Sequence, residues 1–213
     1  GGGTAKLAIL EEGQVKATAA VHIGGRLQVV DEGGRIVRLD SAGRTHAKRA
    51  GFDWNIGDTV TAEQLDKVAE VMAQTMIDSL IMRPIPEDIL NLYLTVPINE
   101  WGRVDGVMFS GGVAEYVYGR EERDFGDMGK RLGTAISRLL EDGALPWPLL
   151  DAGECIRATA LGASEYSVQL SGNTTFVSDY AELLPRRNLQ VIQPPYDCPD
   201  EIVADDVAKA VKA

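Results

Sequence analysis

The sequence predicts an α/β protein in which strands come first and helices then alternate with shorter strands. The first fifty of the 213 residues are mostly β-prone runs separated by Gly-containing turns. From Thr61 onward, apolar residues recur at the 3.6-residue spacing of a helix. Helix-like and strand-like segments then follow one another, and this order is typical of a layered α/β domain.

Two β-hairpins are expected near the start of the chain. A polar turn at residues 11–14 separates two β-prone runs, and the second of these runs ends at Gly24-Gly25. A further Gly-containing turn at residues 31–34 lies between two more such runs. The expected strand pairs are residues 7–10 with 15–23, and residues 27–30 with 35–39.

A long helix is expected after Thr61, because Thr61 and Gln64 form a capping box and Pro84 ends the run. Its apolar stripe is interpreted as core and consists of Leu65, Val68, Met72, Met76 and Leu80. The later elements expected are strands at 92–94, 104–109, 168–170, 175–177 and 189–192, and helices at 113–118, 128–140 and 154–166. We expect one domain over residues 1–193, followed by an acidic tail or short helix over 194–213.

The charge balance argues against polyanionic partners. The formal net charge is −11 and the pI is about 4.7, which opposes binding to nucleic acid or to an anionic membrane. A local basic stretch is interpreted as a solvated face and contains Arg35, Arg38, Arg44, Lys48 and Arg49. No apolar run reaches the roughly 18 residues of a membrane span, and the two cysteines indicate a reducing cytoplasm.

Metal binding by protein ligands is not expected, because His22 and His46 lie apart and no zinc-ligand spacing occurs. His22 lies in a strand before Gly24-Gly25 and is interpreted as a packed or exposed strand residue rather than a phosphate contact. Cys155 is expected to be a small buried hydrophobe in an Ala-rich helix rather than a nucleophile, since no histidine neighbours it.

Two glycine turns carry the strongest chemical signal. Gly1-Gly2-Gly3-Thr4 leads into the first strand, and Ser110-Gly111-Gly112 joins an expected strand to an expected helix. Glycine lets backbone N–H groups converge on an anion such as a phosphate. The first turn taken alone is equally typical of a flexible end or a cloning remnant. Neither turn is a Walker A loop or a Rossmann fingerprint, so the common mononucleotide folds are disfavoured.

The pair of turns resembles the actin-like ATPase superfamily, which has a ribonuclease H-like fold and includes heat-shock 70 chaperones and sugar kinases. Its second-phosphate motif, Asp-x-Gly-Gly-Gly-Thr, is similar to residues 1–4, and its adenosine motif is similar to residues 107–113. Longer strings resemble the family of ethanolamine ammonia-lyase reactivating factors, EutA. These strings are residues 1–10, 109–119, 154–159 and 169–174.

The resemblance implies a mixed β-sheet with flanking helices and a chaperone-like ATPase that frees a stalled adenosylcobalamin enzyme of damaged cobalamin. ATP and Mg²⁺ would be its cofactors, and cobalamin would be met only through the partner, ethanolamine ammonia-lyase. The expected location is the bacterial cytoplasm, in association with a microcompartment.

The resemblance also implies roles for particular residues. Gly1, Gly2, Gly3 and Thr4 would contact the β- and γ-phosphates of ATP, and Gly111-Gly112-Val113 would contact the nucleoside. Glu115 has two interpretations: contact with a ribose hydroxyl, or a carboxylate that complements the start of a helix.

Departures from the superfamily pattern limit the expectation. The acidic residue that opens the second-phosphate motif and the whole first-phosphate motif are not in the sequence, so the catalytic carboxylates are unknown. The chain is expected to be incomplete relative to the two-lobed fold, as a fragment or a truncated homologue, and not to hydrolyse ATP alone. Exposed sheet edges favour self-association. Alternative functions are the large subunit of a diol or glycerol dehydratase reactivase, and a non-catalytic actin-like scaffold for partner binding.

Overall fold

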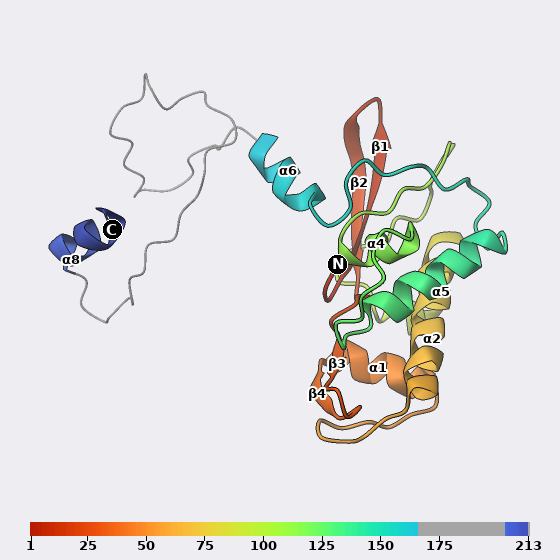
Figure 1. Cartoon of the computed structure of the whole chain (residues 1–213). Coiled ribbons are helices and arrows are strands. Elements are labelled where there is room, and N and C mark those ends of the chain that lie inside the picture. The colour runs from red at the N-terminus through yellow and green to blue at the C-terminus, as the bar shows by residue number, and fades with distance from the viewer. Residues whose placement is uncertain (166–202, 213) are drawn as a thin grey trace. The chain divides into compact units, whose positions relative to one another are not determined.

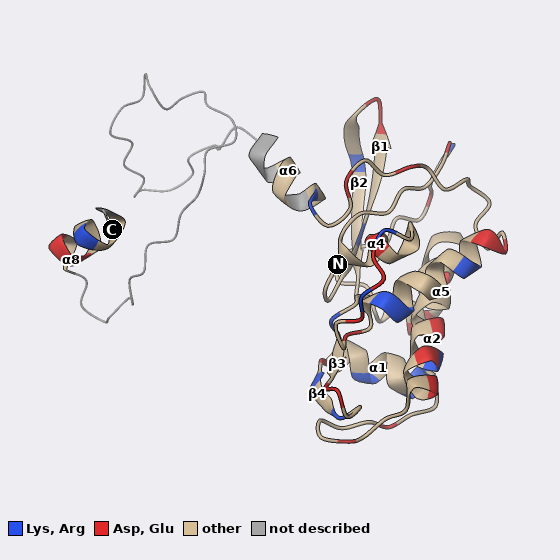
Figure 2. Ribbon diagram, in the orientation of Figure 1, with Lys and Arg blue, Asp and Glu red and all other residues tan. Residues whose placement is uncertain are grey.

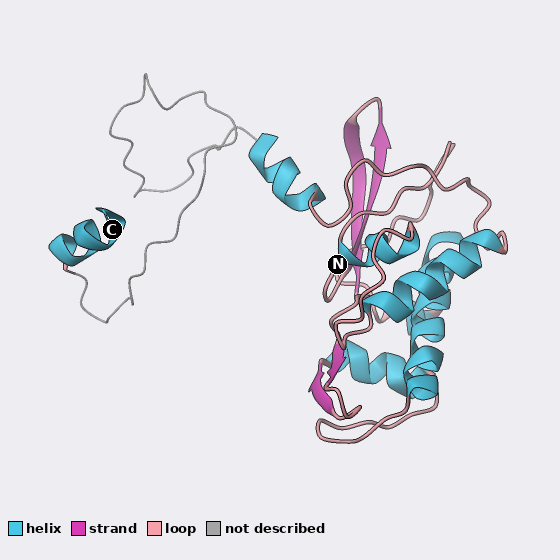
Figure 3. Ribbon diagram, in the orientation of Figure 1, coloured by secondary structure: helices cyan, strands magenta, loops and turns pink. Residues whose placement is uncertain are grey.

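The computed structural model describes residues 1–165 and 203–212, and it has the predicted α/β composition (Figures 1 and 3). The chain divides into two compact units, residues 1–159 and residues 160–213. The boundary predicted between residues 193 and 194, and the strands predicted at 168–170, 175–177 and 189–192, lie outside the described residues.

Both predicted hairpins are confirmed. Strands β1 (Ala5–Glu11) and β2 (Gln14–Val21) pair antiparallel from Ala5 opposite Val21 to Glu11 opposite Gln14, with a register shift between Ile9 and Leu10. The turn residues Glu12 and Gly13 have φ angles of 51° and 76°, and two such positive values are typical of a tight hairpin turn. The second hairpin pairs β3 (Gln28–Val30) with β4 (Ile36–Leu39).

In the described part of the chain, the strands form two separate two-stranded antiparallel sheets instead of the mixed β-sheet that the resemblance implies. The strand predicted at 104–109 contributes one parallel bridge, Val107 with Leu149. Its neighbouring segment contains Pro148, which has no N–H group, so a continuous ladder cannot extend there. The strand predicted at 92–94 is likewise reduced to one bridge, between Tyr93 and Val21.

The predicted helices form with shifted ends. The longest, α2 (Ala62–Ile81), begins at the predicted capping box: the Thr61 hydroxyl accepts from the Gln64 N–H at 3.3 Å, and the Gln64 side chain accepts from the Thr61 N–H at 2.9 Å. The other predicted helices are α4 (Gly112–Val117), α5 (Gly129–Glu141), α6 (Ala158–Glu165) and α8 (Ala204–Lys212). Helix α6 begins four residues later than predicted, so Cys155 lies in the turn before it rather than within a helix.

Two helices were not predicted, α1 (Ser41–Arg49) and α3 (Glu87–Leu90). Helix α1 lacks a stripe of large apolar residues, because the residues it buries are Ala42, Gly43, His46 and Ala47. Periodicity of large apolar side chains therefore carried no signal there.

The basic stretch around α1 is only partly a solvated face (Figure 2). Arg35, Arg38 and Lys48 are exposed, as predicted. The Arg44 guanidinium instead donates to the Trp54 carbonyl at 2.7 Å, and Arg49 forms an ion pair with Asp88. These two side chains connect α1 to the segments that follow it.

The main hydrophobic core lies in the first unit, where α5 packs against both α2 and α4, and α1 packs against α2. Fully buried side chains from strand ends and helices meet there, including Val21, Ile23, Met72, Leu132 and Ile136. Within residues 1–165 and 203–212, no helix is long and apolar enough to span a membrane.

Candidate nucleotide-binding site at the glycine junction

The structure brings the two predicted glycine turns together. A Cβ atom added to Gly111 would lie 3.6 Å from the Gly1 nitrogen and 3.8 Å from the Gly1 Cα. Gly111 has φ 94°, a left-handed value that favours glycine. The N-terminal end of the chain accordingly lies beside α4 (Figure 1). We call residues 1–4, 24–25 and 110–113 the glycine junction.

Gly24 and Gly25, which were not predicted as site residues, connect the two turns. The Gly1 carbonyl accepts from the Gly25 N–H at 3.1 Å, and the Gly2 carbonyl accepts from the Arg26 N–H at 2.6 Å. A Cβ at Gly24 would lie 2.4 Å from the Gly2 carbonyl oxygen, so a larger residue does not fit there. In the sequence, the position of this Gly-Gly pair directly after a predicted strand could have indicated that it belongs to the site.

Gly25 also reaches the helices on the other side of the junction. Its carbonyl accepts from the Met128 N–H at 2.7 Å, directly before α5. A Cβ at Gly25 would lie 2.9 Å from the Gly129 Cα and 3.1 Å from the Val113 Cγ2. The turn after β2 is therefore packed against the starts of α4 and α5, and this contact places the two predicted turns side by side.

Several backbone donors at the junction are free. Within residues 1–165, the N–H groups of Gly2, Gly3, Gly112 and Val113 donate to no protein acceptor. The Gly111 N–H is different, because it donates to the Cys155 carbonyl at 2.8 Å. Unpaired N–H groups next to side-chain-free Cα atoms suit an anionic oxygen of a ligand.

Glu115 lies in the first turn of α4, where its carboxylate oxygen Oε1 accepts from the Ile156 N–H at 2.9 Å. The side chain thereby joins α4 to the segment before α6. Its predicted contact with a ribose hydroxyl stays a prediction.

Two side chains that were not predicted, Tyr118 and Arg120, hold the same segment. The Tyr118 hydroxyl accepts from the Phe109 N–H at 3.1 Å and donates to the Leu150 carbonyl at 2.8 Å. Burial raises the pKa of this hydroxyl, which favours the protonated donor. The Arg120 guanidinium donates to the carbonyl of Ala152. Cys155 is buried as predicted, and burial raises the pKa of its thiol, which disfavours a reactive thiolate.

His22 lies just after β2, whereas a position within the strand was predicted, and it is partly exposed. Its N–H donates to the Leu92 carbonyl at 2.8 Å, and its carbonyl accepts from the His46 ring at 2.8 Å. The backbone of His22 is therefore used in packing α1 and residue 92 against the end of β2.

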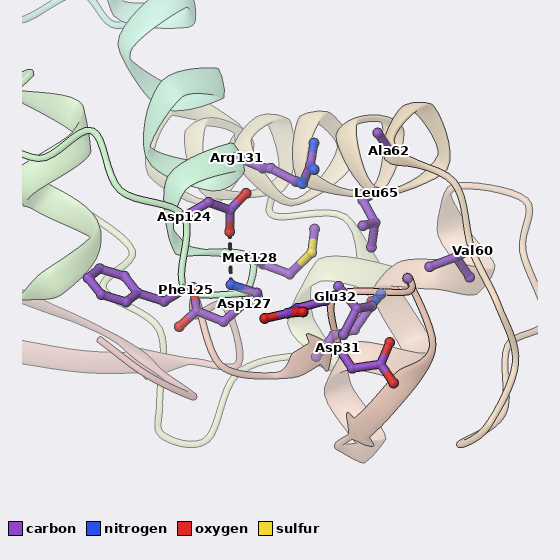
Figure 4. A pocket seen from close by; sticks show the side chains of 14 residues that line it. Asp31, Glu32, Val60, Ala62, Leu65, Asp124, Phe125, Asp127, Met128 and Arg131 are labelled. Carbon is purple, nitrogen blue, oxygen red and sulfur yellow. Dashed lines mark hydrogen bonds between the residues drawn. The ribbon is translucent and has the colours of Figure 1, made fainter.

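A second feature is a cavity of about 650 Å³ that adjoins the glycine junction through Met128 (Figure 4). It is formed by the β3–β4 turn, the start of α2 and the segment from Asp124 to Arg131, and none of its lining residues belongs to the glycine junction. Among the residues that the structure describes, no group of three or more His, Cys, Asp or Glu side chains is arranged to hold a metal ion.

The chain is similar to known proteins along its whole length. The family described as "Ethanolamine utilisation protein EutA" matches residues 1–213. An ethanolamine ammonia-lyase reactivase EutA from Salmonella typhimurium is 30% identical over an alignment of 204 residues that covers 92% of this chain and 42% of the relative. Its namesake from Escherichia coli is 29% identical over an alignment of 201 residues that covers 91% of this chain and 41% of the relative. No solved structure matches the chain.

Proposed function

Because the chain belongs to the ethanolamine utilisation protein EutA family, we propose that it is part of a reactivating factor for ethanolamine ammonia-lyase. Two relatives that each align with more than nine-tenths of the chain are named as reactivases of that enzyme, which supports the proposal. The chain spans less than half the length of both relatives, 42% and 41%. We therefore propose a contribution to reactivation rather than the whole activity.

We further propose that the glycine junction binds ATP, as in an actin-like fold. The free N–H groups of Gly2 and Gly3 and the Thr4 hydroxyl would hold the phosphates, while Gly111 to Val113 would face the nucleoside. The observation that carries this proposal is the close approach of Gly111 to Gly1. This proximity supports the proposal, because a single nucleotide would have to contact both turns.

Magnesium would enter this site mainly through the phosphates, because Mg²⁺ is commonly held by substrate phosphates, water and one or two carboxylates. Its chemistry would be to offset the phosphate charge. The residues of this chain would bind and orient the nucleotide, bridging the hairpin side of the junction to α4 and α5. We retain the hypothesis that the chain alone does not hydrolyse ATP at a meaningful rate, since it contains no first-phosphate motif.

In the whole reactivase, exchange or hydrolysis of this nucleotide would alter how the two sides of the junction are held together. A ligand shifts such an equilibrium only through different contacts in the two states. We propose that this conformational change acts on the bound lyase and causes it to release damaged cobalamin, in the bacterial cytoplasm or an associated microcompartment.

Nucleotide binding is tested by calorimetric titration of ATP·Mg²⁺ into the chain and into Gly112→Ala. A Cβ at Gly112 meets only Ile156 side-chain atoms, the nearest at 3.8 Å, so the variant is expected to fold. If the nucleoside lies against Gly112, the added methyl group weakens binding by about fivefold to tenfold. Gly153→Ala is the matched control, because nothing lies within 4 Å of its added Cβ. Equal affinities in all three proteins, or no binding, would contradict the proposed site.

Partner choice is tested by measuring binding of the chain to ethanolamine ammonia-lyase and to diol dehydratase. We expect saturable binding to the lyase alone, because both named relatives act on the lyase. The dehydratase alternative is not favoured by these comparisons. Binding to the lyase without any nucleotide binding would instead support the non-catalytic scaffold, and preference for the dehydratase would overturn the proposal.

A further inference from the structure

The 650 Å³ cavity between the β3–β4 turn, α2 and the start of α5 contains a polar group with no partner. Gln28 lines it, with only 1% of the residue exposed to solvent. Neither the Nε2 nor the Oε1 atom of its side chain has a hydrogen-bond partner. A buried carboxamide without partners is costly, so a ligand that satisfies both atoms would gain free energy from them.

Apolar side chains form much of the remaining wall, namely Val30, Val60, Leu65 and Met128. Gln28 lies in β3 opposite Leu39 of β4, and this pairing fixes its backbone. Because both polar atoms of the Gln28 carboxamide are buried, a ligand must be slender and neighbouring side chains must shift for it to reach them. Aliphatic carbon atoms suit the wall beside it.

The rest of the cavity is acidic. Its lining includes the carboxylates of Asp31, Glu32, Asp124 and Asp127, against one guanidinium, that of Arg131. Arg131 already forms an ion pair with Asp66. The cavity therefore favours a cation over an anion.

Backbone contacts hold three of these carboxylates in place. Oδ1 of Asp31 accepts from the N–H groups of Gly33 and Arg35, both at 2.9 Å. Oδ1 of Asp124 accepts from the Gly126 N–H, and Oδ1 of Asp127 accepts from the Gly129 N–H, both at 2.8 Å. Glu32 has no partner within the described ranges, and Figure 4 shows its side chain directed toward the loop of Asp124 and Asp127. Because no described carboxylate cluster suits a metal, an organic cation with N–H donors fits this set better.

We propose that this cavity binds a small aliphatic amino alcohol. The hydroxyl group accepts from Nε2 of Gln28 and donates to Oε1, while the ammonium group donates to the carboxylates around Glu32. The carbon chain lies against the apolar wall. This binding involves neither the glycine junction nor the lyase.

The test is a titration of the ¹⁵N-labelled chain with ethanolamine, the smallest primary amino alcohol, at constant ionic strength. We expect saturable shifts of the amide signals of Val30, Gly126 and Met128, which line the cavity or lie next to its polar groups. Gln28→Leu removes the unpartnered carboxamide, so it should weaken binding by at least about tenfold without lowering the melting temperature. Glu32→Gln should weaken binding by about threefold or more.

Glu12→Gln is the matched control, since Glu12 is an exposed carboxylate at the distant β1–β2 turn, and it should leave affinity unchanged. Ethylamine lacks the hydroxyl and ethylene glycol lacks the charge, so both should bind more weakly than ethanolamine. The proposal would be overturned if ethylamine bound as tightly as ethanolamine, or if the shifts were non-saturable and sodium chloride reproduced them. It would also be overturned if a lysine peptide bound more tightly than ethanolamine in a Gln28-dependent manner. The titration contains no lyase and no nucleotide, so its failure would leave the proposed reactivase function untouched.

Discussion

At the residue scale, His46 links burial to pH dependence. Its ring is fully buried, and its Nε2 atom must carry the hydrogen because the partner, the His22 oxygen at 2.8 Å, is only an acceptor. The Nδ1 atom is buried without a partner. Desolvation by burial lowers the pKa of His46, outweighing the opposing effect of the hydrogen bond to His22.

Because the pKa of His46 is lower in the folded chain, there is a pH range in which His46 is protonated in the unfolded chain but neutral in the folded chain. This contribution to stability is therefore complete above the unfolded pKa, near 6.5, and is lost as the pH falls toward the folded-state value. We expect the free energy of unfolding to decrease between pH 8 and pH 5.5, measured by urea denaturation. His46→Gln should flatten this decrease, whereas His22→Gln should not. Equal slopes for all three proteins would show that His46 is not the responsible group.

At the scale of elements, the crossing of α4 and α5 depends on Gly133. A Cβ there would lie 2.5 Å from the Tyr116 Cβ and 2.7 Å from the Val113 carbonyl oxygen. Both are rigid parts of α4, so the helices must separate to accept a methyl group. This contact also keeps α4 next to Gly25 and so supports the glycine junction.

Gly133→Ala sets two effects against each other. Higher helix propensity should gain up to about 1 kcal/mol, but overpacking costs about 1–3 kcal/mol. Because both clashing atoms are rigid, we expect net destabilisation of about 1–2 kcal/mol in urea denaturation. Gly162→Ala in α6 is the control, since nothing lies within 4 Å of its added Cβ, and it should be neutral or slightly stabilising. A stabilised Gly133→Ala would contradict the close crossing.

At the scale of the whole molecule, the net charge of −11 implies self-repulsion in the compact state. The ion pairs described are mostly exposed, and exposed pairs contribute only about 0–1 kcal/mol each. Screening of the repulsion should therefore outweigh screening of these pairs. We expect the melting temperature to rise by a few degrees between 10 and 200 mM salt, because the Debye length falls from about 30 Å to less than about 8 Å over this range. Choline chloride should match sodium chloride, and a fall in melting temperature would show that the ion pairs dominate.

Prediction from the sequence was most accurate for elements whose hydrogen bonds and backbone conformation depend only on neighbouring residues. The hairpin turn at Glu12-Gly13 and the capping box at Thr61 are local, and both formed as predicted. The strand predicted at 104–109 needed a partner that sequence alone did not identify, and that partner contains Pro148. Helix α1 was missed because small residues, rather than large apolar ones, form its buried face.

The candidate site shows the same division. The types of residue in the two glycine turns predicted, before any fold was known, that these segments bind an anion. The contribution of Gly24 and Gly25 and the tether from Glu115 to Ile156 depend on residues distant in sequence, and no local pattern encodes such approaches. Gln28 likewise carries no signal in the sequence, because only packing leaves its carboxamide without a partner.

The sequence by itself determined the family, the α/β class, both hairpins and the long capped helix. These follow from local conformational preferences and from residue strings that are short and contiguous. The tertiary structure alone decided that the strands form two separate sheets, that Gly1 lies beside Gly111, and that an acidic cavity encloses Gln28. Each of these depends on which distant segments pack together, and burial and chain connectivity select that packing over the whole molecule.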